Sequence, residues 1–373
     1  SFTGEDVAEL HVHGGRAVIA AVLARLAGFP GLRTAEAGEF TRRAFAAGRM
    51  DLTEIEGLAD LVRAETEAQR RQAVRQASGA IRAAADEWRK LLVRARAMVE
   101  AELDFADEED VPGSVSDRAW QDVRRVRDAV AAELADGGRG ERLRDGAEVV
   151  LVGPVNAGKS SLMNALARRD VAIVSAEAGT TRDVIEVRLD VDGYPLTLVD
   201  TAGLREAGGE VEREGIRRTR ARAAGADLIL ALSDVSGGEG DGLGLPAGVP
   251  VLRVGTKVDL VPSPEEGERL RYAFDVLVST RTGEGIDQLL ARLATFGRES
   301  MGAGESVLIT RARHRDALGV VREALGTALG GDLPLELRAE ELRHATDALG
   351  RLTGRVDVED LLDVVFRDFC IGK

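Results

Sequence analysis

The hydrophobic positions of this chain follow a helical period before residue 147. Between residues 52 and 105, apolar residues recur three or four positions apart, as on a long amphipathic helix: Val74, Ala77, Ile81, Ala84, Trp88, Leu91, Ala95 and Met98. Pro112-Gly113 ends this pattern. A second helical pattern, which Gly137-Gly138 ends, consists of Trp120, Val123, Val126, Val130 and Leu134. We therefore expect two long helices here.

The middle of the chain alternates between short apolar runs and helical stretches. The apolar runs predict strands at 148–152, 184–191, 196–200, 227–233, 249–254 and 274–278. This alternation predicts a mainly parallel sheet with helices on both faces. Further on the pattern is helical again, with apolar faces in 316–330, 335–350 and 358–369.

These changes divide the chain into four parts, and the fold class is multi-domain, α/β and all-α. Residues 1–50, with a helix-like segment at 17–27, are interpreted as the remnant of an α+β domain. Residues 51–146 and 299–373 are expected to pack together as a helical bundle. The α/β domain, residues 147–298, is inserted between these halves.

Composition narrows the class of protein. With 373 residues, 44% hydrophobic and 31% charged, the chain is expected to be a soluble protein of several domains. Its apolar runs fall short of the ~18 residues of a membrane span. The single cysteine, Cys370, excludes an internal disulfide and favours a reducing, cytoplasmic setting. Cys370 is interpreted as buried packing more readily than as a redox group. The chain begins with Ser1 in mid-domain sequence, so we expect a segment upstream.

The net charge of −14 argues against non-specific nucleic-acid binding by the molecule as a whole. Two basic clusters stand out nevertheless. We interpret both as solvated helix faces more readily than as RNA contacts; they are Arg311, Arg313, His314 and Arg315, and Arg70, Arg71, Arg75 and Arg82.

Residues 153–160 read Gly-Pro-Val-Asn-Ala-Gly-Lys-Ser, the P-loop pattern. An apolar run precedes them and a helix-like segment follows, so backbone N–H groups and a helix N-terminus would face a phosphate. Lys159 would neutralise the β- and γ-phosphates, and the Ser160 hydroxyl would bind Mg²⁺. This segment predicts a nucleoside triphosphate site; its candidate residues are Asn156, Ala157, Gly158, Lys159, Ser160 and Ser161.

Further segments follow in the order expected of a GTPase. Asp200-Thr201-Ala202-Gly203 would reach the Mg²⁺ shell and the γ-phosphate, and Thr181 would bind Mg²⁺ from a switch loop. In Thr256-Lys257-Val258-Asp259, the carboxylate would accept two hydrogen bonds from guanine. The commoner motif begins with Asn, so we expect Thr256 to lose a contact that steadies the loop. Ser279-Thr280-Arg281 would back the guanine.

Hydrolysis would need an unusual arrangement. In Ras-type GTPases a glutamine after Asp-x-x-Gly orients the attacking water. Leu204 stands there in this chain and cannot form a side-chain hydrogen bond, while four carboxylates follow: Glu206, Glu210, Glu212 and Glu214. The Asn156 amide is suited to bind K⁺ in place of an arginine finger. By residue type alone, an ordinary loop role for Asn156 is equally favoured.

The chain resembles the MnmE (TrmE) family of tRNA-modifying GTPases over nearly its whole length. The segments that carry the resemblance are Ser1-Phe2-Thr3-Gly4-Glu5-Asp6, His13-Gly14-Gly15, Gly38-Glu39-Phe40-Thr41, Arg43-Ala44-Phe45, Asp51-Leu52-Thr53, the GTPase motifs with Leu204-Arg205-Glu206, and the terminal Phe369-Cys370-Ile371-Gly372-Lys373. The final pentapeptide, together with a GTPase domain inserted between helices, is highly specific.

The resemblance implies a function in tRNA modification. With a flavoprotein partner, MnmG, in a heterotetramer, such a protein adds a carboxymethylaminomethyl or aminomethyl group at C5 of the wobble uridine of certain tRNAs. It implies a homodimer in which K⁺-dependent pairing of GTPase domains triggers hydrolysis. Residues 1–50 would then belong to a domain that binds a 5-formyl or 5,10-methylene tetrahydrofolate derivative.

The resemblance also assigns residues by matching position. Glu212 would orient the water, and Ser160 and Thr181 would hold Mg²⁺. The GTP and K⁺ loop would comprise Ser175, Ala176, Glu177, Ala178, Gly179 and Thr180, with K⁺ held by Asn156, Ser175, Glu177 and Thr180. Glu9, Arg49 and Lys373 would line the folate pocket, with Arg49 standing where a lysine is usual.

A second hypothesis is a GTPase switch in ribosome assembly that catalyses no modification. That class usually carries an appended RNA-binding module rich in Lys and Arg. This chain is acidic and ends in Cys-Ile-Gly-Lys, so tRNA modification is favoured.

Overall fold

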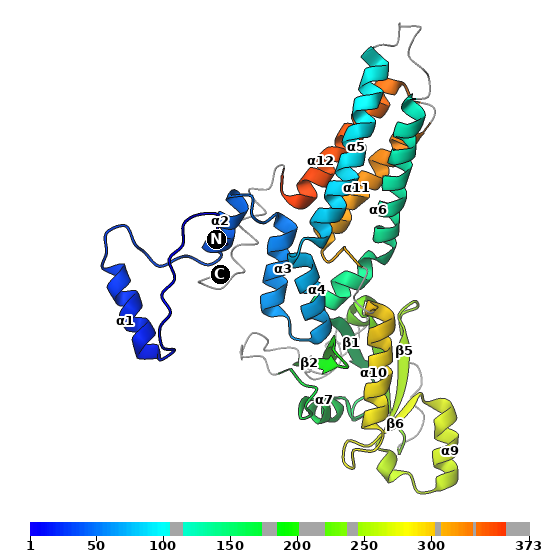
Figure 1. The fold of residues 1–373 in the computed structure, drawn as a ribbon. Helices are drawn as coiled ribbons and strands as arrows, with labels where there is room; N and C mark the ends of the chain where they lie inside the picture. The colour runs from blue at the N-terminus through cyan, green and yellow to red at the C-terminus, as the bar shows by residue number, and fades with distance from the viewer. Residues whose placement is uncertain are drawn as a thin grey trace, which may run out of the picture. The chain divides into compact units, whose positions relative to one another are not determined.

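The computed structural model describes residues 1–104, 115–173, 185–200, 221–236, 245–302, 307–330 and 333–355 (Figure 1). The chain forms two compact units. The first unit comprises residues 1–63, 72–137 and 311–373, and the second comprises residues 64–71 and 138–310. The predicted division into four parts, with boundaries after residues 50, 146 and 298, stays a prediction.

A mainly parallel sheet forms the centre of the second unit. Its six strands have the order β2-β3-β1-β4-β5-β6, and only β2 runs antiparallel, against β3. The strands are β1 Ala147–Val152, β2 Ile185–Val191, β3 Tyr194–Asp200, β4 Leu228–Asp234, β5 Val251–Thr256 and β6 Val276–Val278. Each predicted strand is therefore present, with ends shifted by a few residues.

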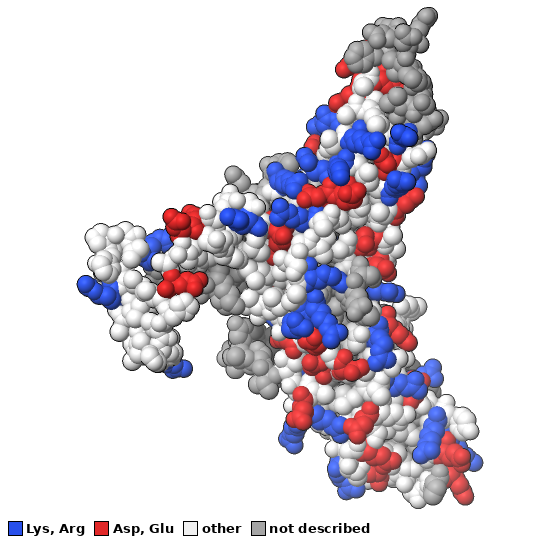
Figure 2. All heavy atoms as spheres, in the orientation of Figure 1, with Lys and Arg blue, Asp and Glu red and all other residues white. Residues whose placement is uncertain are grey.

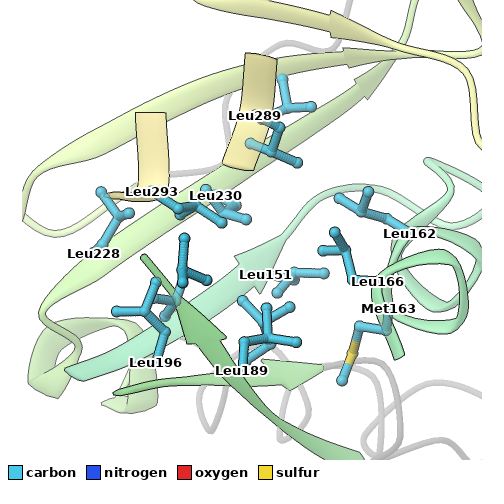
Figure 3. Packing of buried hydrophobic residues seen from close by; sticks show 14 of the residues in the cluster. Leu151, Leu162, Met163, Leu166, Leu189, Leu196, Leu228, Leu230, Leu289 and Leu293 are labelled. Carbon is cyan, nitrogen blue, oxygen red and sulfur yellow. The ribbon is translucent and has the colours of Figure 1, made fainter. Parts of the chain in front are cut away.

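Alternate residues of the strands face two separate hydrophobic clusters, as the pleat of a sheet requires. On one face, Leu151 and Leu230 pack with helices α7 (Lys159–Ala167) and α10 (Ile286–Met301), and Figure 3 shows their leucine side chains converging. On the other face, Val150 and Ile229 pack with Ala223, which lies in the helical residues 221–225. The prediction of helices on both faces is confirmed.

Helices make up the first unit. They are α1 Arg16–Ala27, α2 Glu39–Ala46, α3 Leu52–Arg63, α4 Glu67–Ala77, α5 Ala80–Asp104, α6 Val115–Asp145, α11 Ala312–Leu329 and α12 Leu335–Thr353, of which α4 and α6 extend into the second unit. Helix α12 packs against α11, α5 and α3. Segments from before and after the sheet thus form one helical bundle, as the predicted fold class requires.

The single helix predicted through residues 74–98 is wrong, because α4 ends at Ala77 and α5 begins at Ala80. Gly79 separates them with a φ of +86°, a conformation that favours glycine. The buried face of α5 differs from the predicted one at three positions, since Ala85, Leu92 and Val99 are buried rather than Ala84, Leu91 and Met98. The apolar period predicted the helix but did not fix its orientation.

The predicted end of the next helix at Gly137-Gly138 is also wrong, because α6 continues to Asp145. Tertiary packing explains the continuation. A Cβ atom on Gly140 would lie 2.1 Å from the Ile309 carbonyl oxygen, so the two backbones touch there. Leu143, one turn further on, is fully buried in the cluster of the sheet. Such contacts outweigh the helix-breaking tendency of glycine, about 1 kcal/mol per residue.

The two basic clusters differ from each other. Arg70 and Arg71 are more than half exposed and both pair with Glu67, so these two form the predicted solvated helix face, whereas Arg82 of the same cluster is half-buried and pairs with Glu54 in α3. In contrast, Arg313 and His314 contact the buried carboxylate of Glu56, which corrects the predicted solvated face. Figure 2 shows that basic and acidic side chains are mixed over the visible face. Among the described residues, no helix is long and apolar enough to cross a membrane.

Candidate functional site

The phosphate-binding loop connects the end of β1 to the start of α7. Asn156 and Gly158 have positive φ angles of 66° and 88°, which turn the loop tightly into the helix. A Cβ atom on Gly153 would lie 2.5 Å from the Leu232 carbonyl oxygen, so only glycine fits at this position. The strand, loop and helix predicted from the sequence are therefore present.

Lys159 and Ser160 occupy the first turn of α7. The Lys159 ammonium donates hydrogen bonds to the carbonyl oxygens of Gly153 (2.7 Å) and Pro154 (2.8 Å), which hold it against the loop. The Ser160 hydroxyl donates to Asp200 Oδ2 at 3.0 Å, and Asp200 is buried at the end of β3. A hydroxyl and a carboxylate at this distance are oxygen ligands of the kind that Mg²⁺ prefers.

Thr256 ends β5 and links two parts of the site. Its buried hydroxyl lies 2.8 Å from the Ala157 carbonyl oxygen in the phosphate-binding loop and 3.2 Å from that of Ser233. Gly158 is also close, since a Cβ there would lie 3.5 Å from the threonine. The expectation that Thr256 lacks a contact steadying the loop is wrong. Its hydroxyl joins residues 256–259, the predicted guanine-binding loop (the base loop), to the phosphate-binding loop.

Lys257 follows with a positive φ of 61° and pairs with Asp234 at the end of β4. Burial raises the pKa of Asp234, but hydrogen bonds from Lys257 and Ser236 outweigh this and hold that pKa below its usual value. Asp234 is a residue that the sequence reasoning missed. The signal was present, because Asp234 directly follows the predicted strand 227–233, but its neighbour in the sheet was unknown.

Asp259 lies in a short 3₁₀ turn, η2 (Val258–Leu260). The buried Ser279 donates a hydrogen bond to Asp259 Oδ1 at 2.6 Å, and Arg281 Nε lies 2.9 Å from Oδ2. The hydrogen bond from Ser279 is the main reason that the pKa of Asp259 is lowered, so the group is an anion at neutral pH. The structure thus brings together the two segments predicted to surround a guanine.

The remaining predicted site residues either are exposed or lie outside the part of the chain that the structure describes. Thr280, between Ser279 and Arg281, and Ser161 in α7 are exposed. Glu9 is exposed and lies near His11, with 3.4 Å between Oε2 and Nε2. Arg49 is exposed beside Gly4. Outside the described residues lie Ser175, Ala176, Glu177, Ala178, Gly179, Thr180, Thr181, Thr201, Ala202, Gly203, Leu204, Glu212, Cys370 and Lys373.

Two family models match the chain. The MnmE helical domain matches residues 52–370, and the GTP-binding protein TrmE N-terminus matches residues 1–49. The tRNA modification GTPase MnmE of Parvibaculum lavamentivorans is 56% identical over all of this chain and 84% of the relative. The protein of the same name from Brucella ovis is 53% identical, over all of this chain and 83% of the relative.

Among solved structures, Aquifex aeolicus Era bound to GDP and AlF₄⁻ is 21% identical, with a TM-score of 0.33 over 51% of this chain and 69% of that chain. This similarity is too low to add to the family matches. The family models and the relative that is 56% identical over the full chain indicate the same family. The contact between the phosphate-binding loop and residues 256–259 is consistent with it. The chain belongs to the MnmE family of tRNA modification GTPases.

Proposed function

We propose that this GTPase binds GTP along the carboxyl edge of its sheet. The observation that carries the proposal is the hydrogen bond from Thr256 to Ala157, which joins the base loop to the phosphate loop. Ser160 with Asp200, and Asp259 with Ser279, lie along the same edge. Ligands of open α/β sheets bind outside the carboxyl ends of the strands, so this arrangement supports one continuous nucleotide site.

In this proposal, each polar residue at the carboxyl edge of the sheet has one role in nucleotide binding. Lys159 would exchange its two carbonyl partners for β- and γ-phosphate oxygens. Ser160 would bind Mg²⁺ directly, together with Thr181, and Asp200 would orient the Mg²⁺ shell. Bound Mg²⁺ would supply positive charge at the β- and γ-phosphate oxygens. Asp259 would accept hydrogen bonds from guanine N1 and N2, held in position by Ser279.

We further propose that Glu212 orients the attacking water, since Leu204 cannot. Asn156 would bind K⁺, together with residues 175–180. The side chain of Asn156, which belongs to the phosphate-binding loop, is exposed, and this is compatible with that role. Positive charge at this position would stabilise the transferring phosphoryl group, which is where an arginine finger acts in other GTPases.

At the level of the cell, we propose a cytoplasmic homodimer that works with an MnmG-type flavoprotein on the wobble uridine of certain tRNAs. Glu9, Arg49 and Lys373 would bind the tetrahydrofolate derivative that donates the carbon. The relatives support the tRNA part of this proposal, since they carry the name tRNA modification GTPase MnmE. The dimer, the flavoprotein partner and the folate site follow from the family resemblance.

The test is a strain that lacks the gene and expresses either the wild type or Ser160→Ala. We expect the wild type to restore the modified wobble uridine, measured by mass spectrometry of tRNA nucleosides. Ser160→Ala removes a proposed Mg²⁺ ligand and should not restore it. Normal wobble modification in the strain without the gene would contradict the proposal. In that case, a defect in ribosomal subunit profiles would favour the assembly switch.

A further inference from the structure

Arg281 is the exposed partner of the carboxylate proposed to read the guanine base. Its side chain is 75% exposed, whereas that of Asp259 is 11% exposed. The Nε atom of Arg281 lies 2.9 Å from Oδ2 of Asp259. The hydroxyl of Ser279 donates a hydrogen bond to Oδ1 from the buried side. Both oxygens of Asp259 therefore already accept a hydrogen bond, one from the interior and one from the solvent side.

A guanine base would need the same acceptors. Its N1–H and N2–H₂ groups form a planar pair of donors, and a guanidinium presents its N–H groups in a similar planar fork. Ser279 is fully buried and can stay in place, because each carboxylate oxygen has a second lone pair. Arg281 lies on the accessible side of Oδ2, so its guanidinium and the base would occupy overlapping positions.

The backbone around Arg281 is fixed, so only its side chain can yield. The N–H of Ser279 donates to the Glu284 carbonyl at 2.9 Å, and the N–H of Gly283 donates to the Ser279 carbonyl at 2.9 Å. The Thr282 N–H donates to the Ser279 hydroxyl at 3.2 Å. These bonds close the loop between β6 and α10 on both sides of Arg281 and limit the movement of its backbone.

We propose that Arg281 competes with the guanine base for the Asp259 carboxylate, so that this ion pair must open before a guanine nucleotide binds. The inference rests on the proposed role of Asp259. It makes Arg281 a determinant of the association rate, because only the fraction of molecules with an open carboxylate can bind. Once the base is bound, Arg281 lies in solvent, rather than backing the guanine as its motif predicts, and does not affect dissociation.

The size of the effect follows from the strength of exposed ion pairs. Such pairs shift an equilibrium by roughly 1.5- to 5-fold. Arg281→Ala should therefore bind a fluorescent GDP analogue roughly 1.5 to 5 times faster in stopped-flow measurements, with an unchanged dissociation rate. Salt screens an exposed pair, so raising NaCl to about 0.5 M should bring the wild type towards the variant.

The matched control is Arg298→Ala in the same unit. Arg298 is also exposed and ion-paired, with Asp192 at 3.0 Å, so this variant removes one equal charge without touching Asp259. We expect its association rate to equal that of the wild type. An Arg281→Ala variant that associates no faster than Arg298→Ala, or that dissociates faster, would overturn the proposal, because Arg281 would then bind the nucleotide or act only through charge.

A second variant separates this inference from the proposed function. If Asp259 reads guanine, Asp259→Asn should weaken GDP binding on the order of 100-fold, since bidentate recognition is lost. Unaltered binding by Asp259→Asn would refute the base-reading role itself. Weakened binding by Asp259→Asn, together with no acceleration in Arg281→Ala, would refute only the competition by Arg281.

Discussion

Thr256 illustrates how one residue can keep a motif working after a substitution. A hydroxyl has a single proton, and the closer of its two carbonyl neighbours is Ala157 at 2.8 Å. The contact is buried, so losing it would leave a carbonyl oxygen without that donor. The sequence motif predicts that Thr256 weakens the site, but in the structure Thr256 connects the two loops of the site.

The prediction at the residue scale concerns Thr256→Val, which keeps the shape of the side chain and removes its hydroxyl. We expect GDP and GTP affinity to fall by a similar factor, roughly 5-fold or about 1 kcal/mol, because in the proposed binding mode both nucleotides contact both loops. Isothermal titration calorimetry measures this. Thr256→Ser retains the hydroxyl and is the control; equal affinities for Val and Ser variants would show that the hydrogen bond is unimportant.

At the scale of elements, α3 and α11 are joined by a buried ionic cluster. Glu56 in α3 accepts hydrogen bonds from Arg313 Nε at 2.6 Å and contacts His314 Nε2 at 2.9 Å. Arg311 pairs with Asp60 at 2.6 Å, and Arg313 also reaches the Leu352 carbonyl in α12 at 3.0 Å. The charges of α3 and α11 thus pair with each other, and Arg313 also connects them to the backbone of α12.

The charges of this cluster are set by its surroundings. Burial raises the pKa of Glu56, but the bonds from His314 and Arg313 outweigh burial and place that pKa below its usual value. Burial lowers the pKa of His314, so the imidazole is neutral at pH 7. Glu56 is therefore the anion that balances the half-buried Arg313.

The prediction at this scale is that Glu56→Gln destabilises the first unit by about 3 kcal/mol, because the Arg313 cation loses its counter-charge. Both tryptophans, Trp88 and Trp120, lie in this unit, so urea unfolding followed by tryptophan fluorescence reports on it specifically. Glu340→Gln is the control, since Glu340 forms an exposed pair with Arg343 and should change stability little. Similar effects of the two variants would contradict this view of the cluster.

At the scale of the whole molecule, a helical bundle and a nucleotide-binding unit are built from interleaved segments. The start of α4 belongs with the sheet: the Ala68 N–H donates to the Gly193 carbonyl at 3.2 Å, and Gln69 Nε2 to that of Arg144 at 2.9 Å. A sequence-based boundary at residue 147 could not include this helix, because its contacts are with residues far along the chain.

The prediction for the whole molecule concerns the cation. If K⁺ takes the place of an arginine finger, GTP turnover should be faster in K⁺ than in Na⁺, on the order of 10-fold or more. Phosphate release at equal ionic strength measures it. Asn156→Ala is expected to remove the difference while the protein still binds GDP. Equal turnover of the wild type in both salts would refute the role of Asn156.

The sequence by itself determined that these strands and helices form, and it contains the residues proposed to bind the nucleotide at the edge of the sheet. Short sequence patterns specify the residues proposed to bind phosphate and guanine, because such recognition needs particular backbone conformations, donors and acceptors. These residues are Gly153, Gly158, Lys159, Ser160 and Asp259. The six strands followed from apolar runs, which depend on neighbouring residues only. For the same reason the apolar period predicted that α5 and α6 exist.

Only the tertiary structure decided where helices end and what each polar group contacts. Gly79 divides one predicted helix whereas Gly137 and Gly138 do not interrupt another, because the close packing of Gly140 and Leu143 supports α6 there. The pairing of Lys257 with Asp234 and of Asp259 with Arg281 likewise depends on strand order and loop closure. Such contacts join residues distant in sequence, and their free energy appears only when the sheet and its loops have formed.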